Sequence, residues 1–164
     1  MDSESDLIET VCELIEIGTA TRKEILELLK SIQNRSRLEW PKRSPLVSAV
    51  KSGKKTLLND MIYKFSFDIN STTVEWHEGN WCALGAAIHA NNFDLARYLI
   101  AKGLDLKNIK NKILKDAISF GSVESVKFFL EEVGIDVNFK MWFDENMAKQ
   151  FLPIHFAISS DVAK

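Results

Sequence analysis

The chain has 164 residues, a formal net charge of −2, a hydrophobic share of 46% and a charged share of 27%. These values are those of an ordinary soluble globule and predict no general attraction to nucleic acid or to a membrane. No apolar run approaches the ~18 residues of a membrane-spanning helix, and the acidic first residues show no signal-peptide pattern. Cys12 and Cys82 have no metal or redox spacing, so we expect reduced thiols in a cytoplasmic or nuclear protein.

Residues 1–43 are predicted to form a divergent N-terminal helical cap followed by a basic linker. Apolar residues recur there at three- and four-residue steps in two stretches, which predicts a pair of helices. Gly18 is the predicted end of the first helix, and Thr21 and Glu24 have the spacing of a capping box at the start of the second. The pair is apolar on one side and acidic on the other, which is typical of the terminal unit of a helical array or of a divergent first repeat.

Residues 44–80 contain the stretch with which the rest of the chain is compared. The stretch opens with Ser-Pro-Leu-Val-Ser-Ala, passes through Gly53 and closes with Asp68-Ile69-Asn70. Its apolar spacing predicts a first helix over 46–52 and a second helix over 56–64 that packs back onto the first. The remainder of the segment is expected to form a projecting hairpin.

Later units follow the same pattern over residues 81–110, 111–150 and, incompletely, 151–164. Each unit has an alanine in its first helix, and the aligned positions are Ala49, Ala87, Ala117 and Ala157. Asn91 stands where the first unit has Gly53, and Asn adopts the left-handed conformation most readily after Gly. The last unit stops before its second helix. Half a unit cannot bury its own face, so either the natural chain ends in a frayed tail or the sequence is a piece of a longer array, and we expect the second.

These units resemble the ankyrin repeat, whose pattern opens with Thr-Pro-Leu-His-x-Ala, places Gly after the first helix and closes with Gly-Ala-Asp-Val-Asn. The similarity is plainest at Leu152-Pro153-Ile154-His155-Phe156-Ala157 and at Gly134-Ile135-Asp136-Val137-Asn138, and the aligned alanines scatter around the ~33-residue ankyrin period. The resemblance implies an all-α helical solenoid, a single domain over residues 1–164, in which helix pairs carry short β-hairpin fingers. It also implies a structural hydrogen bond for His155.

Two insertions, residues 71–80 and 139–150, lengthen the predicted fingers, and insertions in such arrays go to loops on one face, often the binding face. The tryptophans lie between repeats, and exposed aromatic rings are leading anchors in protein interfaces. The alternative is that these rings fold back onto neighbouring fingers as small local cores. We predict the partner-binding residues to be Trp40, Trp76, His77, Trp81, His89, Met141, Trp142 and Phe143.

The charges divide along the chain, since residues 1–30 are mainly acidic and residues 31–64 mainly basic. The basic residues around Trp40 either hold an acidic peptide or a phosphate, or form a solvated face that offsets the acidic helices beside it. The first helices are expected to line a concave groove. Their predicted groove-facing residues are Ser48, Lys51, Ser52, Ala86, Ala90, Lys115 and Ser119.

No phosphate-binding loop, nucleophile elbow or His-Glu-x-x-His motif appears, and His77, Cys82 and His89 have no zinc-site spacing. We therefore predict a non-enzymatic monomer, without cofactor or metal, that binds a protein or peptide partner through the groove and the aromatic fingers. An inhibitor or adaptor that occludes an enzyme, and a spacer within a longer solenoid, are the alternatives.

A narrower resemblance adds a further alternative. The order of a short repeat, a long finger insertion and a helix reading Phe-Asp-Leu-Ala-Arg-Tyr-Leu from Phe93 looks like the start of Fem-type ankyrin proteins. Those proteins are substrate receptors of cullin-type ubiquitin ligases. The resemblance implies that this chain is a substrate receptor of that kind, and it assigns no site residues.

Overall fold

The computed structural model describes residues 3–40, 42–73, 82–107, 113–114, 117–118, 122–136, 141–142 and 150–151. The chain divides into two compact units, Met1–Leu104 and Asp105–Lys164. Across the described stretches, no helix has both the length and the apolar character needed to cross a membrane.

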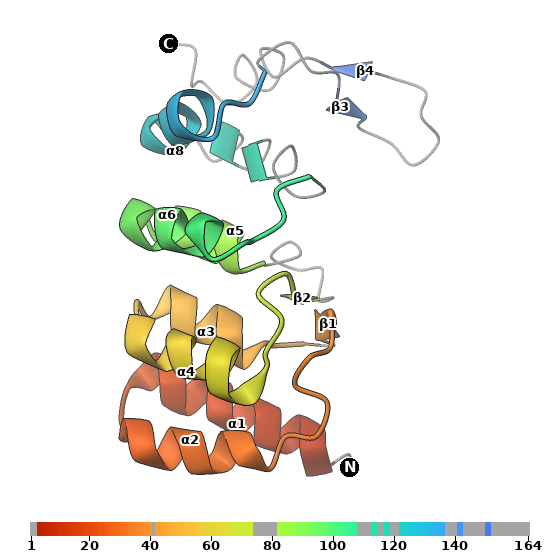
Figure 1. Ribbon diagram of the computed structural model, residues 1–164, viewed down its shortest axis with the longest axis vertical. Coiled ribbons are helices and arrows are strands. Elements are labelled where there is room, and N and C mark those ends of the chain that lie inside the picture. The colour runs from red at the N-terminus through yellow and green to blue at the C-terminus, as the bar shows by residue number, and fades with distance from the viewer. Residues whose placement is uncertain are drawn as a thin grey trace. The chain divides into compact units, whose positions relative to one another are not determined.

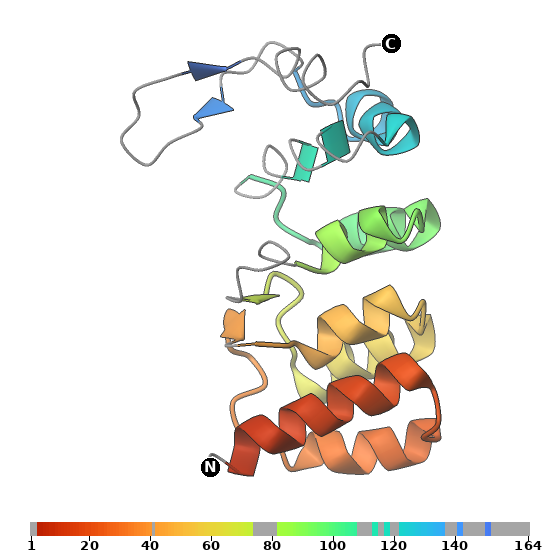
Figure 2. The same cartoon turned by 180° about the vertical axis from the view of Figure 1, so that it is seen from behind.

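The described part of the first unit consists of three consecutive helix pairs (Figure 1). They are α1 (Ser3–Ile17) with α2 (Arg22–Lys30), α3 (Pro45–Lys51) with α4 (Lys55–Phe65), and α5 (Ala83–His89) with α6 (Phe93–Ala101). The first helices contact one another in the order α1, α3, α5, and α2 contacts α4. Figure 1 shows α2 and α4 nearer the viewer, whereas the opposite view in Figure 2 shows α1 and α3 in front. The pairs therefore stack as an inner and an outer layer, as the sequence predicts.

The boundary between α1 and α2 lies where the sequence places it. Gly18 has a φ of 79°, a left-handed conformation that ends α1 without a Cβ penalty. The hydroxyl of Thr21 accepts a hydrogen bond from the backbone N–H of Glu24, and the Glu24 carboxylate accepts one of 2.7 Å from the N–H of Thr21. The predicted capping box is therefore formed, and α2 begins directly after it.

The turn between the helices of a pair repeats along the chain. The carbonyl groups of three of the aligned alanines accept a hydrogen bond from the N–H five residues later: Ala49 from Lys54 at 2.9 Å, Ala87 from Asn92 at 2.9 Å and Ala117 from Ser122 at 3.1 Å. Gly53 and Asn91 occupy the same place in this turn, with φ values of 65° and 52°. Asn91 thus takes the left-handed conformation that its position predicts, and the alanine alignment is confirmed for these three units.

Short strands lie at the base of the predicted fingers. Strand β1 (Glu39–Trp40) pairs in parallel with β2 (Thr72–Thr73), so the linker after the first helix pair and the segment after α4 lie side by side. Thr72 also pairs antiparallel with Cys82, which closes the base of the first insertion. The thiol of Cys82 then accepts a hydrogen bond of 3.3 Å from the N–H of Gly85 and caps α5. The finger therefore returns directly into an inner helix.

The second unit contains α8 (Val123–Lys127), which runs into the π-helical segment η1 (Phe128–Glu132). Ser122 caps α8 through a side-chain oxygen that accepts a hydrogen bond of 3.3 Å from the N–H of Ser125. Strands β3 (Met141–Trp142) and β4 (Gln150–Phe151) pair antiparallel around the second insertion. This pairing confirms a hairpin at the predicted place.

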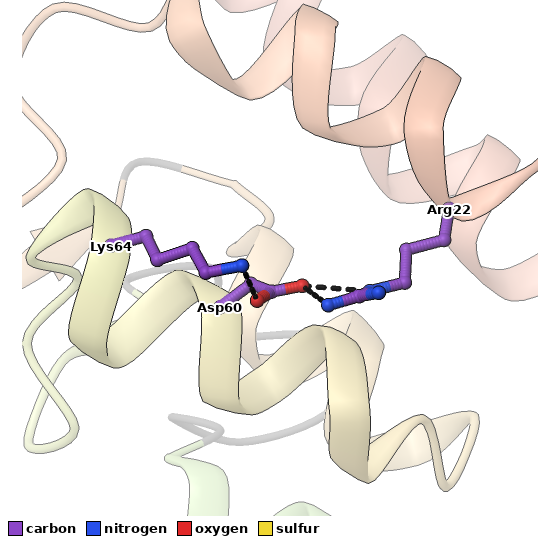
Figure 3. A network of polar contacts seen from close by, with 3 residues as sticks. All are labelled: Arg22, Asp60 and Lys64. Carbon is purple, nitrogen blue, oxygen red and sulfur yellow. Dashed lines mark hydrogen bonds and ion pairs between the residues drawn. The ribbon is translucent and has the colours of Figure 1, made fainter.

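A buried carboxylate joins two outer helices (Figure 3). The side chain of Asp60 on α4 is only 5% exposed. Its Oδ1 lies 2.7 Å from Nζ of Lys64, and its Oδ2 accepts a hydrogen bond of 2.7 Å from Nε of Arg22 on α2. Burial raises the pKa of Asp60, but the hydrogen bonds and charges of Lys64 and Arg22 outweigh it and hold that pKa below its ordinary value. The ion pair therefore anchors α4 to α2.

Replacing Asp60 with Asn should lower the free energy of unfolding by about 1–2 kcal/mol at neutral pH, because two cations lose their shared carboxylate. A carboxylate with a depressed pKa stabilises the folded state above its unfolded pKa of about 3.9, and that stabilisation is lost as the pH falls through the folded value. Urea titrations of the native chain and of Asp60→Asn should therefore converge below about pH 4. A difference that is the same at neutral and at acidic pH would contradict the ionic role.

Candidate functional site

Trp40 is a core residue and not an exposed anchor. Its side chain is 0% exposed and stacks on Phe67, with ring centroids 5.7 Å apart and an interplanar angle of 6°. The guanidinium carbon of Arg37 lies 4.7 Å from the centroid of the Trp40 ring. The prediction of Trp40 as an exposed partner-binding residue is therefore wrong, because the pairing of β1 with β2 draws the ring into the stack. The alternative interpretation, a local core at the finger base, holds for this tryptophan.

The arginines of the basic linker are engaged within the fold. Arg37 lies 3.3 Å from the carboxylate of Glu4. Arg43 lies 2.6 Å from the carboxylate of Glu16, and the side chain of Arg35 donates to the carbonyl of Leu29 at 3.3 Å. These contacts favour the interpretation that the basic segment offsets the acidic α1, rather than the one in which it holds an acidic peptide or a phosphate.

The other predicted site residues fall into three groups. His89 is exposed at the C-terminal end of α5. Met141 and Trp142 form β3, of which the structure describes the backbone. Trp76, His77, Trp81 and Phe143 lie outside the described residues, as do Lys115, Ser119 and His155.

Two predicted groove residues are instead buried between inner helices. Ser48 on α3 is 2% exposed, and its hydroxyl donates a hydrogen bond of 2.7 Å to Glu16 on α1. Ala86 on α5 is 1% exposed, because α5 packs against α3. The positions that remain accessible are Lys51 and Ala90, which are exposed, and Ser52, which is half-buried. On α3 and α5, the exposed surface is therefore found at the C-terminal ends of the helices.

The contact between α1 and α3 is electrostatic as well as apolar. Burial raises the pKa of Glu16, but the hydrogen bonds from Ser48 and Arg43 outweigh it and hold that pKa below its ordinary value. The neighbouring thiol of Cys12 is buried, and this burial raises the pKa of Cys12 to about 11. Cys12 is thus a protonated core residue at neutral pH and a poor nucleophile.

The geometry of the described residues allows binding. Among these residues, no group of three His, Cys, Asp or Glu side chains is arranged to hold a metal ion. The accessible features are the exposed ends of the inner helices and the two insertions closed by Thr72–Cys82 and by β3–β4. This arrangement is the kind of stacked repeat protein in which loops and inner helices provide an extended binding surface.

The chain belongs to the ankyrin-repeat family. The family model "Ankyrin repeats (3 copies)" matches residues 46–141. Ankyrin repeats are generally protein–protein interaction modules and are typically not enzymes. No curated protein matches the chain. The comparisons give no support to the narrower resemblance to Fem-type receptors.

Trp40→Ala should lower the free energy of unfolding by about 3–5 kcal/mol, because it empties a fully buried aromatic site and removes the stack on Phe67. Trp40→Phe, which keeps an aromatic ring, should cost less. Chemical denaturation followed by circular dichroism measures both. Equal stability of Trp40→Ala and the native chain would contradict the burial and return Trp40 to the candidate binding residues.

Proposed function

We propose that this chain binds a protein or peptide partner through its two finger insertions and through the exposed C-terminal ends of its inner helices. The supporting observation is that each insertion begins and ends at paired backbone, the first at Thr72–Cys82 and the second at β3–β4. A loop with two fixed ends has fewer conformations to lose when it binds. The base of each finger is therefore prepared for recognition before the partner arrives.

The residue types within the insertions support the same proposal. Trp76, Trp142 and Phe143 lie within the insertions, and Trp81 directly follows the first of them. All four belong to classes enriched in interfaces, and Trp is among the leading hot-spot residues. The side chain of Trp40, the tryptophan of the linker, is buried in the core. The rings of the insertions are therefore the remaining candidates for aromatic anchors.

The inner helices contribute a second part of the proposed surface. Lys51 on α3 and His89 on α5 both lie two residues after an aligned alanine, and both are exposed. They therefore occupy equivalent places in successive repeats. A rigid row of equivalent positions lets the chain read successive residues of a partner without reordering its backbone.

The double variant Trp76→Ala, Trp142→Ala should retain its protein partner in a pull-down at least tenfold less well than the native chain, because two hot-spot aromatics are worth well over 1.4 kcal/mol. Circular dichroism should show equal helix content in the two proteins. The matched control is Leu38→Ala, Val123→Ala, which removes two side chains that are 60% and 44% exposed and lie outside the insertions and the inner helices. The control should retain the partner fully.

Equal retention by the finger variant and the native chain would move the binding surface to the inner helices. Lys51→Ala, His89→Ala should then reduce retention. If that variant also binds normally, the proposal is wrong. A purified partner further separates two forms of the proposal, because a receptor for a linear signal keeps its affinity for a short peptide of the partner. An inhibitor or adaptor needs the folded partner.

A further inference from the structure

A cluster of aromatic and cationic side chains lies on the outer helices α4 and α6, in the layer opposite the inner helices. We call it the lysine–tyrosine patch, and it consists of Lys55, Asn59, Tyr63, Tyr98 and Lys102. The first three residues recur at four-residue steps, which places them in one row along α4. Tyr98 and Lys102 stand one turn apart at the end of α6.

Tyr98 occupies the centre of the patch. Its hydroxyl donates a hydrogen bond to Oδ1 of Asn59, which ties α6 to α4. The ammonium groups of Lys55 and Lys102 lie 4.4 and 5.4 Å from the centroid of its ring. Lys102 also lies 5.2 Å from the centroid of the Tyr63 ring. Two long side chains are therefore held in place by aromatic faces.

The ammonium groups of Lys55 and Lys102 are available to bind an anionic group. Among the described residues, no carboxylate lies within ion-pair distance of Lys55 or Lys102, although ion pairs engage Arg22, Lys64 and Arg97 on the same outer layer. A hydrogen bond with the Tyr63 hydroxyl raises the pKa of Lys102 above its ordinary value, so this group is fully charged at neutral pH.

The patch also exposes apolar area. Tyr63 is 62% exposed. Within the described part of the chain, it is one of the few large hydrophobic residues that have most of their surface in solvent. An exposed ring beside the ammonium group of Lys102 matches the composition of interface hot spots, where aromatic groups supply area and charges supply selectivity.

We propose that the lysine–tyrosine patch is a second docking surface, separate from the fingers, and that it binds an acidic linear segment of a partner protein carrying an aromatic residue. The charge of the patch calls for carboxylates. The ammonium groups of Lys55 and Lys102 lie 4.4 and 5.4 Å from the centroid of the Tyr98 ring, and the distance between the two groups cannot exceed the sum of these values. Side chains at i and i+2 of an extended peptide, about 7 Å apart on one face, can reach both.

A peptide fits these features better than nucleic acid. The patch supplies two cations, whereas a nucleic acid surface is recognised by long basic stripes and a basic domain. This chain has a net charge of −2. The patch therefore suits a short local charge rather than a polyanion.

The experiment measures binding of the full chain to a fluorescein-labelled peptide, Gly-Glu-Ser-Glu-Ser-Phe-Gly, by fluorescence anisotropy at low ionic strength. This probe places two glutamates and one phenylalanine on one face of an extended chain. The expected result is binding at least tenfold tighter than that of the same peptide with glutamine for glutamate. Lys55→Gln, Lys102→Gln should remove most of this difference, and Tyr63→Ser should weaken binding of both peptides.

The matched control is Lys23→Gln, Lys42→Gln, which makes the same change in net charge at exposed lysines outside the patch. It should bind the acidic peptide as the native chain does. Thermal melts accompany each variant, because the patch also joins α4 to α6.

Four results would overturn the proposal. One is that the native chain binds neither peptide, or both equally. Another is that the control variant loses as much binding as Lys55→Gln, Lys102→Gln. The third is that the patch variant melts at a lower temperature but binds the peptide normally, in which case the lysines only hold two helices together. Tighter, equally lysine-dependent binding of a single-stranded RNA would also overturn it and assign the patch to a polyanion.

Discussion

The structure of the first unit depends on the close stacking of its inner helices. Ala49 and Ala87 are both 0% exposed, and the small side chains let each inner helix approach its neighbour while the alanine carbonyl still anchors the following turn. One short helix pair cannot bury its own apolar face, so each pair is stable only against the next. Everything that faces outward, from finger bases to the lysine–tyrosine patch, is positioned by this repeated contact.

The two sides of the stack use charge differently. On the inner side, a partly buried network joins Glu16 on α1 to Arg43 of the linker and to Ser48 on α3. The charge of Arg43 is therefore used in packing the linker against α1. On the outer side, Asp60 takes up Arg22 and Lys64. A net charge near zero therefore hides local differences. Arg37 and Arg43 of the linker are engaged by carboxylates, whereas Lys55 on α4 and Lys102 at the end of α6 keep their positive charge at the surface.

The elements of the fold follow closely from local rules. The capping box at Thr21, the end of α1 at Gly18, the left-handed Asn91 and the common turn after Ala49, Ala87 and Ala117 were all predictable, since each is decided within about five residues. The candidate site was less predictable. Trp40 has the same residue type and the same place between repeats as the other tryptophans, and only its pairing partner β2 shows that its ring is buried.

The sequence by itself determined the class of this protein, because helix periodicity, caps and repeat spacing are local properties that recur in register and identify an ankyrin array. Only the tertiary structure decided which side chains remain accessible. Ser48 and Ala86 lie on the inner helices as expected, yet neighbouring helices cover them. Lys55 and Tyr98 are in contact between α4 and α6, although their separation in the sequence is longer than one repeat. Burial and pairing depend on contacts between repeats, and no local pattern encodes those contacts.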